Sequence, residues 1–462
     1  MLRSLYITMI YGAFLCGGFV APFALGLGYI WVDNFSPQYV VYSILTEFPV
    51  SMVMAVAAIG AYLLADRRHP PNIGAITVLV FMMLIWCTYT TFDDAVAYEE
   101  AYFKWTWAAK TIVFSLFMPA LFRSRVQIEA FLQIYVLSLS AQFLPFALKT
   151  LYSGGGYGAS FGLVAGNTGL SEGSTLSTVC MIAAVFALHL SRHQTILPYK
   201  RLARWMYLGL FFACIAAGIG TYERDALIGI GVVMVALWLR SPRKAMWAGI
   251  AAAVAVTLGG YVFESNSAWV QRMLTIGNTQ ESSSLGRLLV WEWTLHFVQD
   301  HPFGGGFYAY VIDSITFPGT QAFPDPVIIH GKAFHSIYFE LLGEQGWPGL
   351  ALFGAIVTTT MVSLRRLRRA CAAIEGMAWG ADLAVTIMIS LCILLVCGAF
   401  ISIAFQPEMY YAFAITVILR QHVRGVRRRM VEEAIKRAER EERRHAEMGE
   451  TLGDGAWAGV LA

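Results

Sequence analysis

Residues 391–400 read LCILLVCGAF and carry no charged side chain. They lie in one of several apolar runs of about 17–25 residues, a length that crosses ~30 Å of hydrocarbon at ~1.5 Å per helical residue. Val78–Trp86 and Thr111–Phe117 lie in similar uncharged runs. Only 14% of the 462 residues are charged, compared with roughly 25% in soluble domains. The sequence therefore predicts an all-α membrane protein and excludes a soluble one.

Basic segments alternate along the chain with acidic or neutral segments. The basic ones are Arg67–Arg68, Arg123 with Arg125, Arg192 to Arg204, Arg240 to Lys244 and Arg365–Arg369. Between them lie Asp33–Pro37, Asp93–Glu100, Gly154–Glu172, Thr221–Arg224, Glu264–Phe334 and Gln406–Glu408. Because Lys and Arg are retained on the cytoplasmic side, this alternation predicts about twelve transmembrane helices with both termini in the cytoplasm.

The first apolar run, Leu5–Val32, leaves a second topology open. It has no cleavage-type ending and is too long for the apolar part of a signal peptide, so we expect it to be retained. If it forms a re-entrant hairpin instead of one crossing, the helix count changes and the N-terminus lies outside.

Three regions are predicted. Residues 1–150 form an N-terminal transmembrane region, and residues 151–420 form a transmembrane core. The core includes one large periplasmic loop, 264–334, between the ninth and tenth helices, which we expect to fold over the membrane surface. Residues 421–462 are predicted to be a charged cytoplasmic helix with i,i+4 pairs such as Glu432 with Lys436.

Two arginines fall in the segments predicted to lie outside. Arg224 is placed at the outer end of a crossing, where an arginine usually has a partner or a function. Arg287 is expected to begin an amphipathic helix, and the turn Gly304–Gly306 after it could approach a ligand closely. Taken alone, Arg224 is equally compatible with an interfacial arginine paired with an acidic neighbour, and an arginine such as Arg287 is more often a solvated surface charge.

His335 begins the sequence HSIYFELLGEQGWPG. If this segment is helical, His335, Phe339, Leu342 and Gly346 share one face, and Gly346–Gly349 breaks the helix. His335 would then lie on a surface helix just above the bilayer.

The His335 segment, the run Asp300-His-Pro-Phe-Gly-Gly-Gly306 and Arg224 resemble the O-antigen ligase and O-antigen polymerase superfamily, over roughly residues 170–420. In that superfamily a His at the end of the largest periplasmic loop is followed by Glu-x-Gly-x-x-Gly, which here reads Glu344-Gln-Gly346-Trp-Pro-Gly349. Residues 1–150 resemble, at fewer positions, the exosortase-associated O-glycosylation ligases; the matching positions are Gly26 to Trp31, Ser36-Pro37 and Lys110.

The resemblance implies a GT-C-like glycosyltransferase of the bacterial inner membrane. Such enzymes move a glycan from undecaprenyl diphosphate to an acceptor hydroxyl on the periplasmic side, with inversion and without metal or other cofactor. It assigns the general base to His335 and the diphosphate contacts to Arg224 and Arg287, roles that suit an imidazole and two guanidinium groups. Lys110, His330, Glu344, Gly304 and Gly306 are weaker, supporting candidates.

The sequence departs from the superfamily in two places. Many relatives have Ser-Arg-Gly around the first arginine, whereas this chain has Glu223-Arg224-Asp225. Oligosaccharyltransferases bind a divalent metal through Glu-x-Asp, so a metal role for these two carboxylates stays open. The Asn-rich segment of the exosortase-associated relatives is replaced here by Ser171–Thr175.

The alternatives differ in class. A non-enzymatic flippase or exporter of lipid-linked oligosaccharide predicts charged residues along several helices around a central cavity. A scaffold of an export complex does not need the histidine and both arginines. The sequence does not distinguish a ligase from a polymerase, and it leaves open whether the acceptor is a glycan, a lipid or a protein. No nucleic-acid partner is expected.

Overall fold

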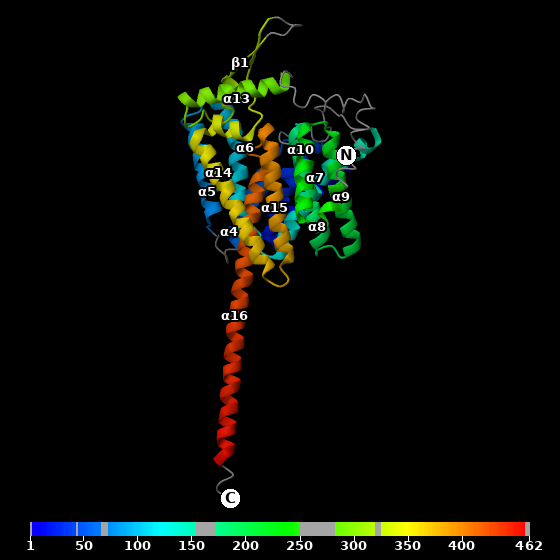
Figure 1. Cartoon of the computed structure of the whole chain (residues 1–462), viewed down its shortest axis with the longest axis vertical. Helices are drawn as coiled ribbons and strands as arrows, with labels where there is room; N and C mark the ends of the chain where they lie inside the picture. The colour runs from blue at the N-terminus through cyan, green and yellow to red at the C-terminus, as the bar shows by residue number, and fades with distance from the viewer. Residues whose placement is uncertain are drawn as a thin grey trace.

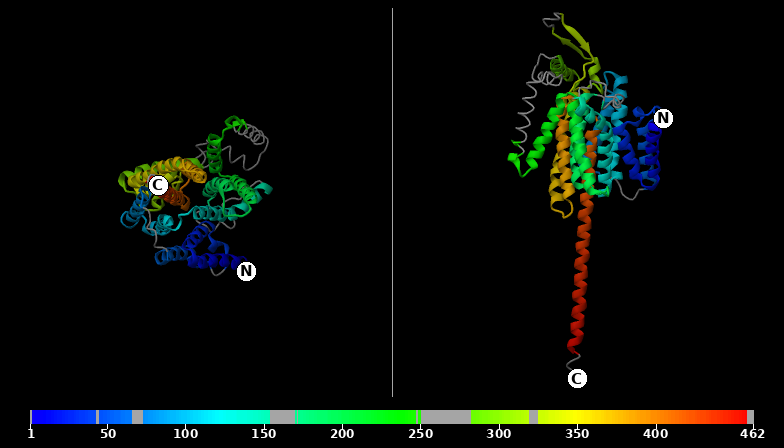
Figure 2. Two further views of the ribbon diagram at one scale, coloured as in Figure 1. Left: turned by 90° about the horizontal axis from the view of Figure 1, so that it is seen from below. Right: turned by 90° about the vertical axis from the view of Figure 1, so that its right-hand side faces the viewer.

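The computed structural model describes residues 2–42, 45–65, 73–153, 170, 172–246, 248, 249, 282–318 and 325–457. The helices in these ranges form a bundle, shown in Figures 1 and 2. They are α1 (Leu2–Val20), α2 (Pro22–Phe35), α3 (Pro37–Val40), α4 (Val50–Ala65), α5 (Ala75–Phe92), α6 (Tyr98–Leu121), α7 (Arg125–Ser153), α8 (Gly173–His193), α9 (Lys200–Gly220), α10 (Arg224–Arg240), α13 (Ser282–Asp300), α14 (Ile337–Ala372), α15 (Ala378–Cys397) and α16 (Pro407–Trp457).

Seven of these helices are long and apolar enough to cross a membrane: α1, α5, α7, α8, α9, α14 and α15. α4 is also apolar over Val50–Leu64 but is shorter than these seven helices. The prediction of an all-α multi-pass membrane protein is confirmed at this level. The count of twelve crossings stays a prediction.

The first apolar run forms two helices rather than one crossing. α1 ends at Val20, and Pro22 begins α2, as expected for a residue whose fixed φ suits a helix start. The rings of Phe14 and Trp31 lie 5.6 Å apart, and Gly17 lies against Ala24, so α1 and α2 run antiparallel. This is the hairpin arrangement that the sequence left open.

As a result, the two ends of the chain lie on opposite sides of the bundle, and the prediction that both termini share one side is wrong. The backbone N–H of Tyr42, which follows α2 and α3, donates to Ser4 Oγ at 3.1 Å. The start of α1 therefore lies on the same side as α13, whereas α16 extends far beyond the opposite side (Figures 1 and 2).

The described basic segments that were predicted to share one side meet at the end from which α16 projects; Arg67–Arg68 lie outside the described residues. Arg125 Nη2 donates to the His193 carbonyl at 3.5 Å, and His422 Nδ1 donates to the Arg123 carbonyl at 2.9 Å. Arg240 pairs with Asp382. This end is called the basic end below, and the opposite one the α13 end.

The described parts of segment 264–334 fold over the α13 end (Figure 1). α13 lies across the bundle and begins at Ser282, one turn earlier than expected from Arg287. The 3-10 turn η2 (Ala309–Ile312) leads into strand β1 (Ser314–Phe317), which pairs antiparallel with β2 (Val327–His330). Ser314 is opposite His330 in this hairpin.

A second short turn, η3 (Gly398–Phe400), follows α15, and α14 is kinked near its start. Gly346 has φ 65° and interrupts the helix, in agreement with the break predicted at Gly346–Gly349. Gly304, with φ 91°, lies against this kink, and a Cβ on it would come within 2.5 Å of Gly346 N. Gly305 N–H donates to the Gly343 carbonyl at 2.9 Å, and Gly306 N–H donates to the Glu344 carbonyl at 3.0 Å. The two glycine motifs therefore bind each other, backbone to backbone.

A buried ion cluster fixes the same region. Lys104 Nζ, on α6, lies 2.6 Å from Glu340 Oε1 and 2.8 Å from Glu344 Oε1, both on α14. Glu344 also accepts the N–H of Tyr308 at 3.0 Å, and Glu340 accepts the N–H of Ala404 at 2.9 Å. One cation and two carboxylates thus join α6, α14, the turn before η2 and the segment before α16.

The hairpin topology predicts where a membrane-impermeant thiol reagent reacts. Leu2→Cys and Asp325→Cys, each in a Cys16→Ser background, should be labelled from the same side of the membrane, and Glu432→Cys only from the other. All three positions are exposed, and Cys16 is the exposed native cysteine. Labelling of Leu2→Cys together with Glu432→Cys would contradict the hairpin.

Removing the cation of the buried cluster should destabilise the fold. Lys104→Met leaves Glu340 and Glu344 without their counter-charge, and breaking one side of a buried ion pair costs about 3–5 kcal/mol. Unfolding of the purified protein in detergent measures this loss. Lys436→Met in the exposed tail is the matched control and should leave the free energy of unfolding unchanged. A Lys104→Met variant as stable as the control would refute the role of the cluster.

Candidate active site

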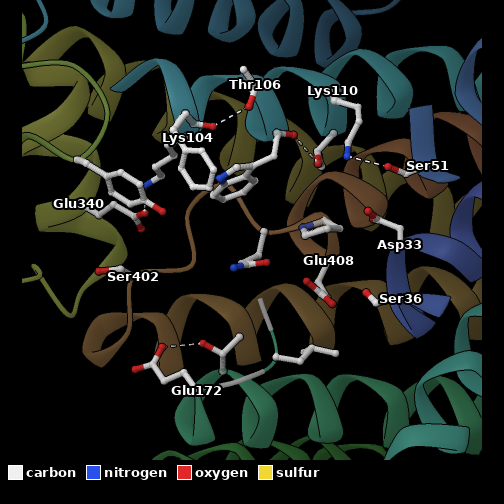
Figure 3. Close-up of a pocket in the computed structure, with 18 of the residues that line it drawn as sticks. Asp33, Ser36, Ser51, Lys104, Thr106, Lys110, Glu172, Glu340, Ser402 and Glu408 are labelled. Carbon is white, nitrogen blue, oxygen red and sulfur yellow. Dashed lines mark hydrogen bonds and ion pairs between the residues drawn. The ribbon is translucent and has the colours of Figure 1, made fainter. Parts of the chain in front are cut away.

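A cavity of about 430 Å³ opens among the helices near the α13 end, and Figure 3 shows the side chains around it. Segments far apart in the sequence line it: the ends of α2, α6, α8, α14 and α16, and the η2 turn. In the figure, Lys104 and Glu340 lie on one side, and Asp33, Lys110 and Glu408 lie on the other. Most of the segments predicted to lie outside the membrane therefore contribute residues to the lining of this cavity.

His335 lies just before α14 and not on it. The helix begins at Ile337 with Ser336 as N-cap, and His335 has φ 47°, in the left-handed region that few non-glycine residues adopt. The expectation that His335 shares a helical face with Phe339, Leu342 and Gly346 is therefore wrong. A turn, not a surface helix, presents the imidazole.

α13 holds this turn in place. Trp291 Nε1 donates to the carbonyl of Phe334 at 2.8 Å, directly before His335. The indole also stacks on Phe339, with ring centroids 4.9 Å apart and an interplanar angle of 2°. Since Arg287 precedes Trp291 by four residues, both lie on one face of α13. The helix that fixes the His335 backbone therefore also carries Arg287 next to it.

The charge of Arg287 acts on the imidazole. Burial, followed by the positive charges of Arg287 and Lys332, lowers the pKa of His335 from 6.5 to about 4. The neighbourhood of His335 is thus cationic and partly dehydrated. At neutral pH the ring is unprotonated and can accept a proton.

Arg224 belongs to a part of the bundle that also adjoins Arg287. It is the first residue of α10, after Glu223 as N-cap, and Ser174 Oγ donates to Glu223 Oε2 at 3.2 Å. Arg287 acts electrostatically on both Glu172 and Asp225. The start of α10, the start of α8 and α13 therefore meet around Arg287.

The supporting candidates occupy different places. Lys110 Nζ donates to Ser51 Oγ at 2.9 Å in the cavity wall. His330 is exposed at the end of β2. Glu344 is fully buried in the ion cluster, and its carboxylate accepts the Tyr308 N–H and so orients the turn before η2. Gly304 and Gly306 pack on the α14 kink and on the chain before α6, so their close approach is to backbone and not to a ligand.

Several residues of the cavity were not predicted. Lys104 lies between Glu100 and Lys110 on α6 and did not stand out from them. Glu340 lies four residues before Glu344 on the same helical face. Glu172 and Glu408 stood out only as members of acidic segments. Asp33, near the end of α2, accepts a hydrogen bond from the hydroxyl of Tyr411, a contact with no local signal in the sequence.

Within the described ranges, the one cluster with metal-ligand spacing lies at the basic end, away from the cavity. It consists of His189, His193 and Asp382, whose ligand atoms lie within 4.8 Å of one another. His189 Nδ1 and Asp382 Oδ2 are 2.8 Å apart, and Arg240 also pairs with this carboxylate. A guanidinium group therefore already occupies the Asp382 carboxylate. Glu223 and Asp225 belong to no such cluster among the residues described.

Two family models match the chain. Residues 2–195 match a model described as "Family of unknown function (DUF5935)", and residues 208–354 match one described as "O-Antigen ligase". No protein with a curated description matches. The resemblance of residues 1–150 to the exosortase-associated subgroup stays a prediction. Arg224, Arg287 and His335 all lie within the second match, and this part of the chain, residues 208–354, is identified with the O-antigen ligase family.

Proposed function

We propose that this protein is an inverting glycosyltransferase that moves a glycan from undecaprenyl diphosphate to an acceptor hydroxyl at the periplasmic face of the bacterial inner membrane. One observation carries the proposal: Arg287 lies beside an unprotonated His335 at one end of a membrane bundle. A general base next to a fixed cation is what transfer from a diphosphate requires.

The reaction is a single displacement at the anomeric carbon. The acceptor oxygen forms a bond to this carbon as the bond to the diphosphate oxygen breaks, and direct attack from the opposite face inverts the configuration. His335 accepts the proton of the hydroxyl. The electron pair of the broken bond goes to the diphosphate, where negative charge increases.

Arg287 and Arg224 bind that diphosphate in the proposal. Guanidinium groups stay protonated and contact phosphate oxygens in pairs. The Nε of Arg287 is buried and has no hydrogen-bond partner among the described residues, so a phosphate oxygen would satisfy a donor that is otherwise unpaired. In a partly dehydrated site such contacts stabilise the developing charge strongly.

Ligase and polymerase activity share this donor chemistry and differ in the acceptor. The proposal therefore covers transfer to a glycan, lipid or protein hydroxyl. The flippase alternative makes no use of a neutral imidazole beside Arg287, because moving an intact lipid-linked oligosaccharide breaks no bond.

Substitution of the three residues separates their roles. His335→Ala should lower turnover by about 10²–10⁴ while leaving donor binding largely intact, because it removes the base alone. Arg224→Ala or Arg287→Ala should weaken donor binding as well as turnover, and Arg→Lys should rescue only partly. Reconstituted protein with a lipid-linked oligosaccharide, assayed separately for binding and turnover, measures both.

His330→Ala is the matched control, because this exposed histidine lies only five residues from His335. It should retain normal turnover. Normal turnover of His335→Ala would defeat the assignment of the base. If the His335 variant and both arginine variants all bind and react normally, the flippase alternative takes the place of the enzyme.

The pH dependence of kcat/KM tests the state of His335. Because burial and two nearby cations lower the pKa of His335 to about 4, the base is lost only at low pH. The rate should stay level from about pH 7 to about pH 5 and then fall about tenfold per pH unit below about pH 4. Lys332→Gln removes one cation and should move this decline to higher pH. A decline centred near the ordinary histidine value and unaffected by Lys332→Gln would contradict the assignment.

A further inference from the structure

The cavity beside His335 differs in charge from the place around Arg287. Its lining contains five carboxylates and two lysines: Asp33, Glu172, Glu340, Glu344, Glu408, Lys104 and Lys110. Lys104 is occupied by Glu340 and Glu344. Lys110 therefore faces three further carboxylates, so the cavity favours neutral over anionic ligands.

Glu408 is the least satisfied of these groups. It is 7% exposed, and its only recorded polar contact among the described residues is with its own backbone amide. Figure 3 shows its side chain pointing into the cavity near Asp33 and Ser36. Ser402 Oγ and Gln38 Oε1, also in the lining, are buried and find no hydrogen-bond partner in the described part of the chain. Buried polar groups without partners are costly, so this wall is suited to accept hydrogen bonds from a ligand.

Aromatic side chains form the remaining wall. Trp107, Tyr308, Tyr310 and Phe334 line the cavity together with Phe103. Aromatic faces bind the apolar C–H faces of sugar rings, while carboxylates accept hydrogen bonds from sugar hydroxyls. A volume of about 430 Å³ falls in the range of small-molecule pockets. The combination suits a neutral saccharide.

The cavity also reaches the reacting residues. Ala333 and Phe334, the two residues before His335, line it. Glu172 lines its lower side in Figure 3 and is under the electrostatic influence of Arg287. A saccharide in the cavity could therefore present a hydroxyl toward His335, with the diphosphate bound on the arginine side.

We propose that this cavity is the acceptor site and binds an uncharged, hydroxyl-bearing saccharide through Glu408 and the aromatic wall. The proposal rests on the proposed transferase function and deepens it. It also gives a role to α2 and α6, which lie within residues 2–195, the segment whose family has no known function. These helices supply the acceptor side together with the start of α16 and with residues of the η2 turn and the start of α14. The base and the two arginines come from residues 208–354 alone.

The test is a kinetic comparison with the full chain in liposomes. The donor is the lipid-linked oligosaccharide, and the acceptor probe is neutral oligosaccharide released from the native cell surface and dephosphorylated. Glu408→Gln should raise the acceptor KM at least tenfold while the donor KM stays within twofold of the unmodified protein. Glu408→Asp should recover part of the loss, because a shorter carboxylate still accepts hydroxyl hydrogen bonds. Glu432→Gln, the same change on the exposed tail, is the control.

A second variant covers the case in which Glu408→Gln fails to fold, judged by loss of donor binding. Trp107→Ala in the aromatic wall should raise the acceptor KM in the same selective way. Unchanged acceptor KM in both variants, with normal transfer, overturns the acceptor site and leaves the proposed function standing. Absence of transfer by the unmodified protein to any acceptor overturns both.

The acceptor class is tested with two further probes. The same oligosaccharide carrying a phosphate should be a poorer acceptor, because the carboxylates repel it. A serine-containing peptide should not be used at all. Transfer to the peptide but not to the oligosaccharide would overturn the saccharide proposal in favour of a protein acceptor.

Discussion

The pairing of Lys104 with two carboxylates is the constraint on which the rest of the site depends. A buried ammonium group is tolerated only with counter-charges and hydrogen bonds, and Glu340 and Glu344 supply both from consecutive turns of α14. These carboxylates in turn bind the N–H groups of Ala404 and Tyr308. His335 lies only five residues before Glu340. The ion cluster therefore helps to fix the position of His335.

The glycine motifs also hold the chain near His335, through backbone hydrogen bonds and not through charge. The kink at Gly346 frees the carbonyl of Gln345, which accepts a hydrogen bond from the indole Nε1–H of Trp86 at 2.8 Å. The neighbouring carbonyls of Gly343 and Glu344 accept N–H groups from Gly305 and Gly306. Because any side chain at Gly304 or Gly346 would meet backbone atoms, these positions admit only glycine. The motifs that identify the family on the sequence are therefore largely structural, and they hold the chain on either side of His335.

The sequence predicted what depends on composition and local pattern: the apolar helices, the break at Gly346 and the grouping of the basic segments. It failed where distant contacts decide. Lys104 meets partners 236 and 240 residues away, so neither the cluster nor the cavity had a local signal. The assumption that α14 begins before His335 failed because Trp291 of α13 holds Phe334 in an irregular turn. The N-terminal hairpin was recognised only as an alternative, since an apolar run alone does not show where it reverses.

In the proposed function, the separation of charge across the site divides the binding of the donor from the binding of the acceptor. Burial, together with the cations that gather where α13 meets His335, keeps the imidazole unprotonated. In the proposed reaction the same cations attract the anionic leaving group. Carboxylates gather in the cavity, where an anionic ligand is disfavoured and hydroxyl groups find acceptors. In such a site the cationic side would attract the anionic donor, and the acidic cavity would favour the neutral acceptor. His335 lies between the cationic region around Arg287 and the acidic cavity. In the proposed reaction, the acceptor hydroxyl would approach the imidazole from the cavity, and the diphosphate would leave on the arginine side.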